Sequence, residues 1–203
     1  MSIMVGSPVQ LGERHVIGPG TRILGGVYYR YGANVVDFDE APRPYEAAYD
    51  HLEEYLTGGE EESLLSFGYA LNWAVNDTMV SDRHLTGAVL RQEALRRGQL
   101  VIGDREEIGL SRFMNAAAGV CRHQALLGGA LVELLQARRD TGIRASFELP
   151  QIPGLNPHHA WLRCTRDDDG VVVDFDQRKV IPVKSLPSAL DYYYSQVESL
   201  AAA

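Results

Sequence analysis

Residues 119–135, GVCRHQALLGGALVELL, combine a cysteine with an apolar run that leaves almost no polar face. Positions 125, 126, 127, 130, 131, 134 and 135 place apolar side chains nearly all around a helix, which predicts a helix buried at the centre of a domain. Gly128 and Gly129 would allow close approach of neighbouring groups. The rest of the fold must therefore enclose one helix whose first turn contains Cys121.

Length and composition are those of an ordinary globular domain. Of the 203 residues, 45% are hydrophobic and 23% charged, which is enough for one well-buried core. The formal net charge of -8 argues against binding to nucleic acid or to an anionic membrane, since both need an excess of lysine and arginine. No signal peptide or membrane-spanning stretch is recognisable, so we expect a cytoplasmic protein of undetermined oligomeric state.

The spacing of apolar residues divides the chain into four segments. Residues 1–43 are rich in glycine and β-formers and predict short strands, whereas residues 44–100 show helical spacing. Residues 101–183 combine the buried helix with strands, and residues 184–203 predict a closing helix. Together they predict a single α+β domain over residues 1–203, with the central helix packed on an antiparallel sheet.

Three helices are expected in the second segment, starting near residues 44, 60 and 82. Their apolar positions include Trp73, Leu85 and Leu95. The strands expected after the central helix cover 144–150, 159–164, 170–176 and 179–183.

Cys121 lies where a helix start favours the thiolate, because backbone N–H groups and the positive end of the helix dipole face its sulfur. A free cysteine is nevertheless more often a small packing residue. With only two cysteines, no disulfide framework is expected, and Cys164 is predicted to belong to the core. Its position at a helix start alone does not decide whether Cys121 is a nucleophile or a packing residue.

His159 and Asp174 complete a possible reactive set. Strand alternation puts His159 on the face opposite Cys164, and Asp174 interrupts the apolar strand VVVDF, where a carboxylate needs a partner. A turn at residues 166–170 predicts a hairpin that brings the start of one strand beside the end of the other. In a register that places both side chains on one face, His159 and Asp174 can meet.

Together, the three residue types can take the roles of a Cys–His–Asp triad. Cys121 would attack an amide carbon, His159 would take and return the proton, and Asp174 would orient the imidazole. His158 is an alternative base and Asp176 an alternative orienting residue.

At these residues the sequence resembles the transglutaminase-like superfamily of papain-fold enzymes. The resemblance rests on GVC with its following A.LL, on Gly-Ile-Arg-Ala at 142–145, on HAW at 159–161 and on a strand ending in Asp174. GVCRHQALL is especially similar to a branch that includes bacterial proteins of poorly defined role and a regulatory domain of plant kinases. The resemblance covers about residues 103–183 and implies a papain-like core with Cys121, His159 and Asp174 as the triad.

The resemblance implies acyl transfer from an amide through a thioester on Cys121, without a cofactor or metal. Water as acceptor makes a protease or amidase, and an amine makes a transglutaminase or another acyltransferase. We favour hydrolysis of a peptide or protein. The oxyanion hole would combine the Cys121 N–H with a donor from Asn72, Gln92 or Asn115.

Arg122 and His123 belong to the branch motif. Arg122 would hold either an acidic group of the substrate or a structural carboxylate, and we favour the structural role. A binding or regulatory module that has lost its chemistry is the alternative function, although all three triad types are present. A metal site is a further alternative, built from Cys121, His123, His158, His159 and Cys164, but the spacing fits no common zinc pattern.

Overall fold

The computed structural model describes residues 10–11, 14–29, 33–56, 63–99, 106–148 and 159–183. Within these ranges the chain forms five helices and eleven short strands, which confirms the α+β class. The helices are α1 (Pro42–Tyr55), α2 (Leu64–Thr78), α3 (Arg83–Arg96), α4 (Leu110–Asn115) and α5 (Cys121–Arg139). The strands are β1 (Gln10–Leu11), β2 (Arg14–His15), β3 (Val27–Tyr28), β4 (Ala33–Val35), β5 (Val80–Ser81), β6 (Glu107–Gly109), β7 (Ala118–Gly119), β8 (Arg144–Glu148), β9 (Trp161–Arg166), β10 (Asp169–Asp174) and β11 (Lys179–Pro182).

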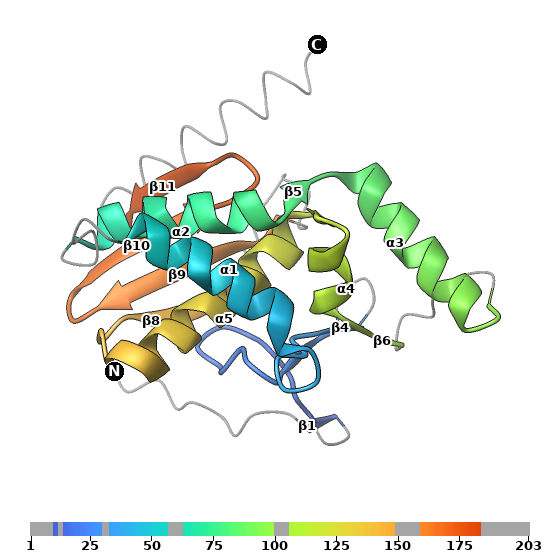
Figure 1. The fold of residues 1–203 in the computed structure, drawn as a ribbon. Coiled ribbons are helices and arrows are strands. Elements are labelled where there is room, and N and C mark those ends of the chain that lie inside the picture. Colours follow the sequence, from blue (N-terminus) through green and yellow to red (C-terminus); the bar gives the residue numbers. More distant parts are fainter. Residues whose placement is uncertain are drawn as a thin grey trace, which may run out of the picture.

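Helix α5 lies at the centre of the molecule, as its apolar run predicts. It packs on β8 and β9, while α1 and α2 contact it from the helical side (Figure 1). Its two glycines occupy places without room for a side chain. A Cβ at Gly128 would lie 2.5 Å from Cζ of Phe175, and one at Gly129 would lie 2.2 Å from Cδ1 of Ile23. The glycines therefore let α5 press against the sheet and the N-terminal segment.

The main sheet has the order β11-β10-β9-β8, and all its neighbouring strands are antiparallel. α5 packs on β8 and β9, and α2 packs on β10 and β11. The predicted turn at residues 166–170 is too long: β9 continues to Arg166 and β10 begins at Asp169, so only Asp167 and Asp168 separate them. Pairing of Gly170 with Thr165 extends the ladder into the predicted turn.

The N-terminal strands are joined to residues far along the chain. β4 pairs with β3 and, in parallel, with β6, and together they form a three-stranded sheet. The carboxylate of Glu133 on α5 accepts the backbone N–H groups of Ile23 and Leu24 at 2.7 and 2.8 Å. Backbone pairing and one carboxylate thus tie the β-rich beginning of the chain to the central helix.

Several apolar positions of the predicted helices are not buried, Trp73, Leu85 and Leu95 among them. Trp73 is 54% exposed, and on α3 Leu85 and Leu95 are 47% and 75% exposed. α3 extends away from the rest of the molecule and makes its main contacts with β7 and α4 (Figure 1). Few neighbours are available to cover its apolar side chains, so helical spacing overestimated the buried face.

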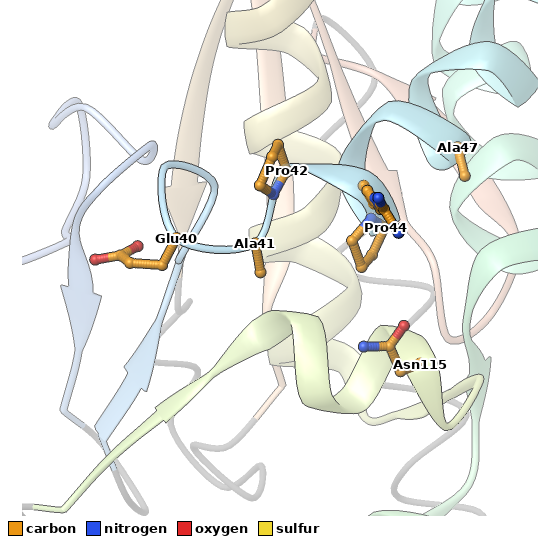
Figure 2. A pocket seen from close by; sticks show the side chains of 7 residues that line it. Glu40, Ala41, Pro42, Pro44, Ala47 and Asn115 are labelled. Atoms are coloured by element: carbon orange, nitrogen blue, oxygen red, sulfur yellow. The ribbon is translucent and has the colours of Figure 1, made fainter.

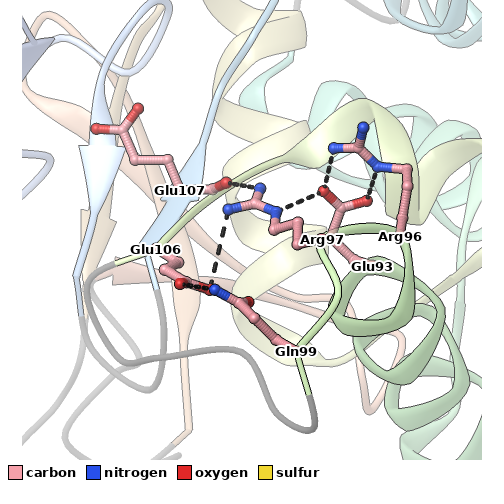
Figure 3. A network of polar contacts seen from close by, with 6 residues as sticks. All are labelled: Glu93, Arg96, Arg97, Gln99, Glu106 and Glu107. Atoms are coloured by element: carbon pink, nitrogen blue, oxygen red, sulfur yellow. Dashed lines mark hydrogen bonds and ion pairs between the residues drawn. The ribbon is translucent and has the colours of Figure 1, made fainter.

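Polar contacts fix the far end of α3 instead. Figure 3 shows the buried carboxylate of Glu93 between Arg96 and Arg97, with Oε1 accepting from Nη2 of Arg96 at 2.6 Å and from Nε of Arg97 at 2.9 Å. Arg97 also donates to the carbonyl of Glu107 on β6 at 2.6 Å. The hydrogen bond from Arg96 and then that from Arg97 outweigh burial and lower the pKa of Glu93 to about 2.

Some expectations fall outside the described residues, namely the helix at 184–203, the acidic start of the second helix at 60–62, and His158. None of the described helices is long and apolar enough to span a membrane. α4 and the short parallel pair β5–β7 were not predicted, because elements of two to six residues carry too little periodicity.

Candidate active site

Cys121 is the first residue of α5 and is partly exposed. The chain reaches it through β7, whose parallel pairing with β5 places the Val80 N–H 3.1 Å from the Ala117 carbonyl. A Cβ at Gly119 would lie 2.2 Å from the sulfur of Met79, so this approach is tightly packed. The helix start that carries the thiol is therefore held by backbone pairing directly before it.

His159 and Asp174 form an ion pair across the β9–β10 hairpin. Nε2 of His159 lies 2.9 Å from Oδ2 of Asp174, and Oδ1 of the same carboxylate accepts the N–H of Gln177 at 3.1 Å. Asp174 is 2% exposed and the side chain of His159 19%. Val173 lies opposite Leu162, the register in which both residues of the pair share a face. The buried carboxylate thus has the partner that its position required.

The environment of His159 favours its charged form. Burial is the largest single influence and lowers the pKa of the imidazole, but hydrogen bonds to Asp174 and to Cys121, followed by their charges, together raise it to about 10. The same hydrogen bond to Cys121 shows that the three predicted residues, from a helix start and two strand ends, meet at one place. An imidazolium between a carboxylate and a thiol is the arrangement that activates a sulfur nucleophile.

The alternative residues lie in other surroundings. Asp176 is exposed and accepts a hydrogen bond from the hydroxyl of Ser81, so it is Asp174 that the structure brings to His159. Cys164 is fully buried in the core, and this burial raises the pKa of its thiol to about 12. Such a thiol stays protonated and unreactive at neutral pH.

Of the three oxyanion candidates, Asn72 lies beside the end of β10 and the other two line cavities near α3 and α4. Asn72 is buried and donates to the backbone carbonyl of Asp174 at 3.3 Å, so its amide supports the end of β10. Gln92 and Asn115 line a cavity of about 280 Å³ between α3 and α4. Asn115 also borders a cavity of about 550 Å³ at the start of α1, where Figure 2 shows it facing Pro42 and Pro44.

The described residues lining these two cavities include no member of the triad. The cavities between α1, α3 and α4 are thus separate features from the Cys121 site.

Two residues after Cys121 the chain buries His123 completely. The sequence assigns His123 to the branch motif and to the alternative metal site, with no positioning role. Burial, followed by the charge of Arg122, moves its pKa well below the usual value, so the ring is neutral. A signal was present in the sequence, because the side chain of the residue three positions after the N-cap can accept the backbone N–H of the N-cap residue.

Within the part of the chain that the structure describes, no three histidine, cysteine, aspartate or glutamate side chains are grouped so that they could hold a metal ion. Comparison of the chain with protein-family models, curated proteins and solved structures finds no match. The geometry around Cys121, His159 and Asp174 is therefore the basis for a proposed function.

Proposed function

We propose that this protein is a cysteine hydrolase of the transglutaminase-like type, which cleaves an amide of a peptide or protein through a thioester on Cys121. The observation that carries the proposal is the position of His159, whose ring bonds both to the carboxylate of Asp174 and to the thiol of Cys121. The order of helix, sheet and triad residues supports a papain-like core around them.

The first half of the reaction forms the thioester. The Cys121 thiolate attacks the amide carbon, and the carbonyl electrons move onto oxygen to give a tetrahedral oxyanion. When the oxyanion collapses, the C–N bond breaks and the leaving nitrogen takes the proton of His159. Since Nε2 is bound to Asp174, the proton would pass from Nδ1, the other ring nitrogen. The amine leaves, and the acyl group remains on sulfur.

The second half restores the enzyme. The now neutral His159 removes a proton from water as its oxygen attacks the thioester carbon, and the C–S bond then breaks to release a carboxylic acid and the thiolate. Asp174 stays ionised throughout, holding the ring in one orientation and stabilising the imidazolium. An amine entering in place of water would give an acyl transferase with the same residues.

Alkylation of the thiol tests the reactive pair directly. We expect iodoacetamide at pH 6 to modify Cys121 about 100-fold faster than the same cysteine in a His159→Gln variant, because only wild-type protein has an imidazole hydrogen-bonded to the sulfur. Cys164 serves as an internal control, since a buried thiol should stay unmodified while the protein is folded. Peptide mass spectrometry after a time course measures both.

A Cys121 that reacts no faster than free cysteine, with a rate independent of His159, would contradict the enzyme and leave a non-catalytic binding module. The substrate class has its own test. Cys121→Ala protein, which forms no thioester, is incubated with cell extract and its retained polypeptides are identified by mass spectrometry. No enrichment over an unrelated control protein counts against a protein-directed enzyme.

A further inference from the structure

His123 occupies a fully buried position at the start of α5, two residues from the proposed nucleophile. We infer that His123 is a positioning residue, which holds Val120 and thereby keeps Cys121 in line with His159. The inference rests on the proposed function of Cys121. It assigns a purpose to one of the two motif residues that the triad leaves unexplained.

Both ring nitrogens of His123 have defined partners. The backbone N–H of Val120 donates to Nδ1 at 3.1 Å, so Nδ1 carries no proton. Nε2 lies 2.8 Å from Oδ1 of Asn34 and must therefore be the donor. The ring of Phe113 stacks on the imidazole with 4.1 Å between centroids. Two hydrogen bonds and one ring face thus define the tautomer and the orientation of His123.

The position before Cys121 explains why such a residue is needed. Val120 is the N-cap residue of α5, and it has no side-chain acceptor of the kind that serine, threonine or aspartate supplies. The hydrogen bond from its own N–H to His123, three residues along, holds Val120 against the first turn instead. Because Val120 is covalently joined to Cys121, any rotation of Val120 moves the thiol relative to His159.

Asn34 connects this contact to the N-terminal sheet. It lies in β4, is buried, and is paired on its two sides with Tyr28 of β3 and Ile108 of β6. The β-rich N-terminal strands, which the family resemblance does not cover, thus reach to within one hydrogen bond of the helix start. The N-terminal sheet therefore supports the site and does not merely extend the domain.

The neutral state of the ring is part of the arrangement. A protonated Nδ1 would direct a second N–H at that of Val120 and lose the hydrogen bond. Burial and the neighbouring charge of Arg122 both oppose that protonation. Nothing in these contacts touches a reacting atom, so His123 acts through Val120 and Cys121.

The test compares variants that separate this role from simple packing. His123→Phe keeps a ring against Phe113 but removes the acceptor for Val120. His123→Asn places Oδ1 near the position of Nδ1 and keeps that acceptor while losing the bond to Asn34. Leu131→Ala, at a buried position further along α5, is the control for general loss of stability.

Two measurements are made on each variant: the rate of Cys121 alkylation by iodoacetamide, and the exchange of the Val120 amide proton by NMR. We expect His123→Phe to slow Cys121 alkylation about 10- to 100-fold, since a small displacement of a reacting group slows a reaction by about this factor. The same variant should speed exchange of the Val120 amide proton. His123→Asn should restore both to within about threefold of the wild-type values, and Leu131→Ala should leave both near wild type.

Unchanged exchange of the Val120 amide proton in folded His123→Phe protein would overturn the inference. An equal slowing of Cys121 alkylation in His123→Phe, His123→Asn and Leu131→Ala would overturn it as well. Where His123→Phe does not fold, His123→Leu, which also lacks the acceptor for Val120, must still speed Val120 exchange relative to Leu131→Ala. The exchange does not depend on catalysis. A failure of the proposed function appears separately, as equal alkylation of wild-type and His159→Gln protein.

Discussion

The start of α5 and the start of β9 each place a histidine near Cys121, and the two rings are held in opposite charge states. His123 is fully buried among an asparagine, a backbone N–H and a phenyl ring, and its pKa lies well below the usual value. His159 is also largely buried, but it faces Asp174 and Cys121, and its pKa is raised to about 10. Burial lowers the pKa of both rings, and only the partners of His159 reverse that effect.

This difference suits the two rings to the two roles proposed for them. A neutral imidazole with a fixed tautomer accepts one hydrogen bond and donates another, which suits a ring that holds the backbone. An imidazolium stabilised by a carboxylate can give a proton to a leaving group and take it back from water. The two histidines can be tested against each other by changing the partners that distinguish them.

The largest effect is expected from removal of the carboxylate beside His159. Asp174→Asn should slow Cys121 alkylation at pH 6 by up to about 100-fold, the effect expected for His159→Gln, because the ring loses the charge that keeps it protonated and oriented. Asp176→Asn is the matched control on the same strand end, where the carboxylate contacts Ser81 instead. Comparable losses in both variants would contradict the assignment of Asp174.

At alkaline pH, the dependence of the free energy of unfolding on pH should reflect the titration of His159. Its folded pKa of about 10 exceeds the unfolded value of 6.5, so its contribution is fully present below pH 6.5 and is lost as the pH rises through 10. Urea unfolding between these limits should show the free energy of unfolding falling by up to about 1.4 kcal/mol per pH unit. Asp174→Asn should flatten this limb, and an unchanged slope would contradict the raised pKa.

At acid pH, the free energy of unfolding should reflect the titration of His123, and it should fall as the pH is lowered. Its folded pKa lies below the unfolded value of 6.5, so its contribution is present above pH 6.5 and is lost as the pH falls below it. As the pH falls from 6.5 we expect the free energy of unfolding of wild-type protein to fall, again followed by urea unfolding. His123→Asn, which has no titrating group, should remove the slope; its persistence would place the titration elsewhere.

The smallest effect on Cys121 alkylation is expected from a change at Glu93, whose ion pairs with Arg96 and Arg97 lie at the far end of α3. Glu93→Gln should lower the free energy of unfolding by about 1 kcal/mol, since Arg96 is largely exposed and solvent screens the pair. Cys121 alkylation should stay within about twofold of the wild-type rate, because the partners of Glu93 are Arg96 and Arg97 at the far end of α3. A larger change would show that the two histidines are sensitive to the whole helical layer.

Local sequence patterns predicted much of the framework. The buried helix that begins at Cys121 and the antiparallel strands after it follow from apolar periodicity, and they appear as α5 and β8 to β11. A carboxylate inside VVVDF required a partner, and the register that pairs Val173 with Leu162 places Asp174 beside His159. Periodicity failed for Leu95, because a repeating pattern cannot tell whether another element covers the helix face.

The sequence by itself determined the members of the proposed triad: a cysteine at a helix start, a histidine before a strand and an aspartate at a strand end. Only the tertiary structure decided between Asp174 and Asp176, and only it revealed that Asn34, 89 positions earlier, binds His123. Patterns along the chain reflect contacts within a few residues, whereas these choices depend on strand register and on long-range packing, where a single hydrogen bond selects the partner.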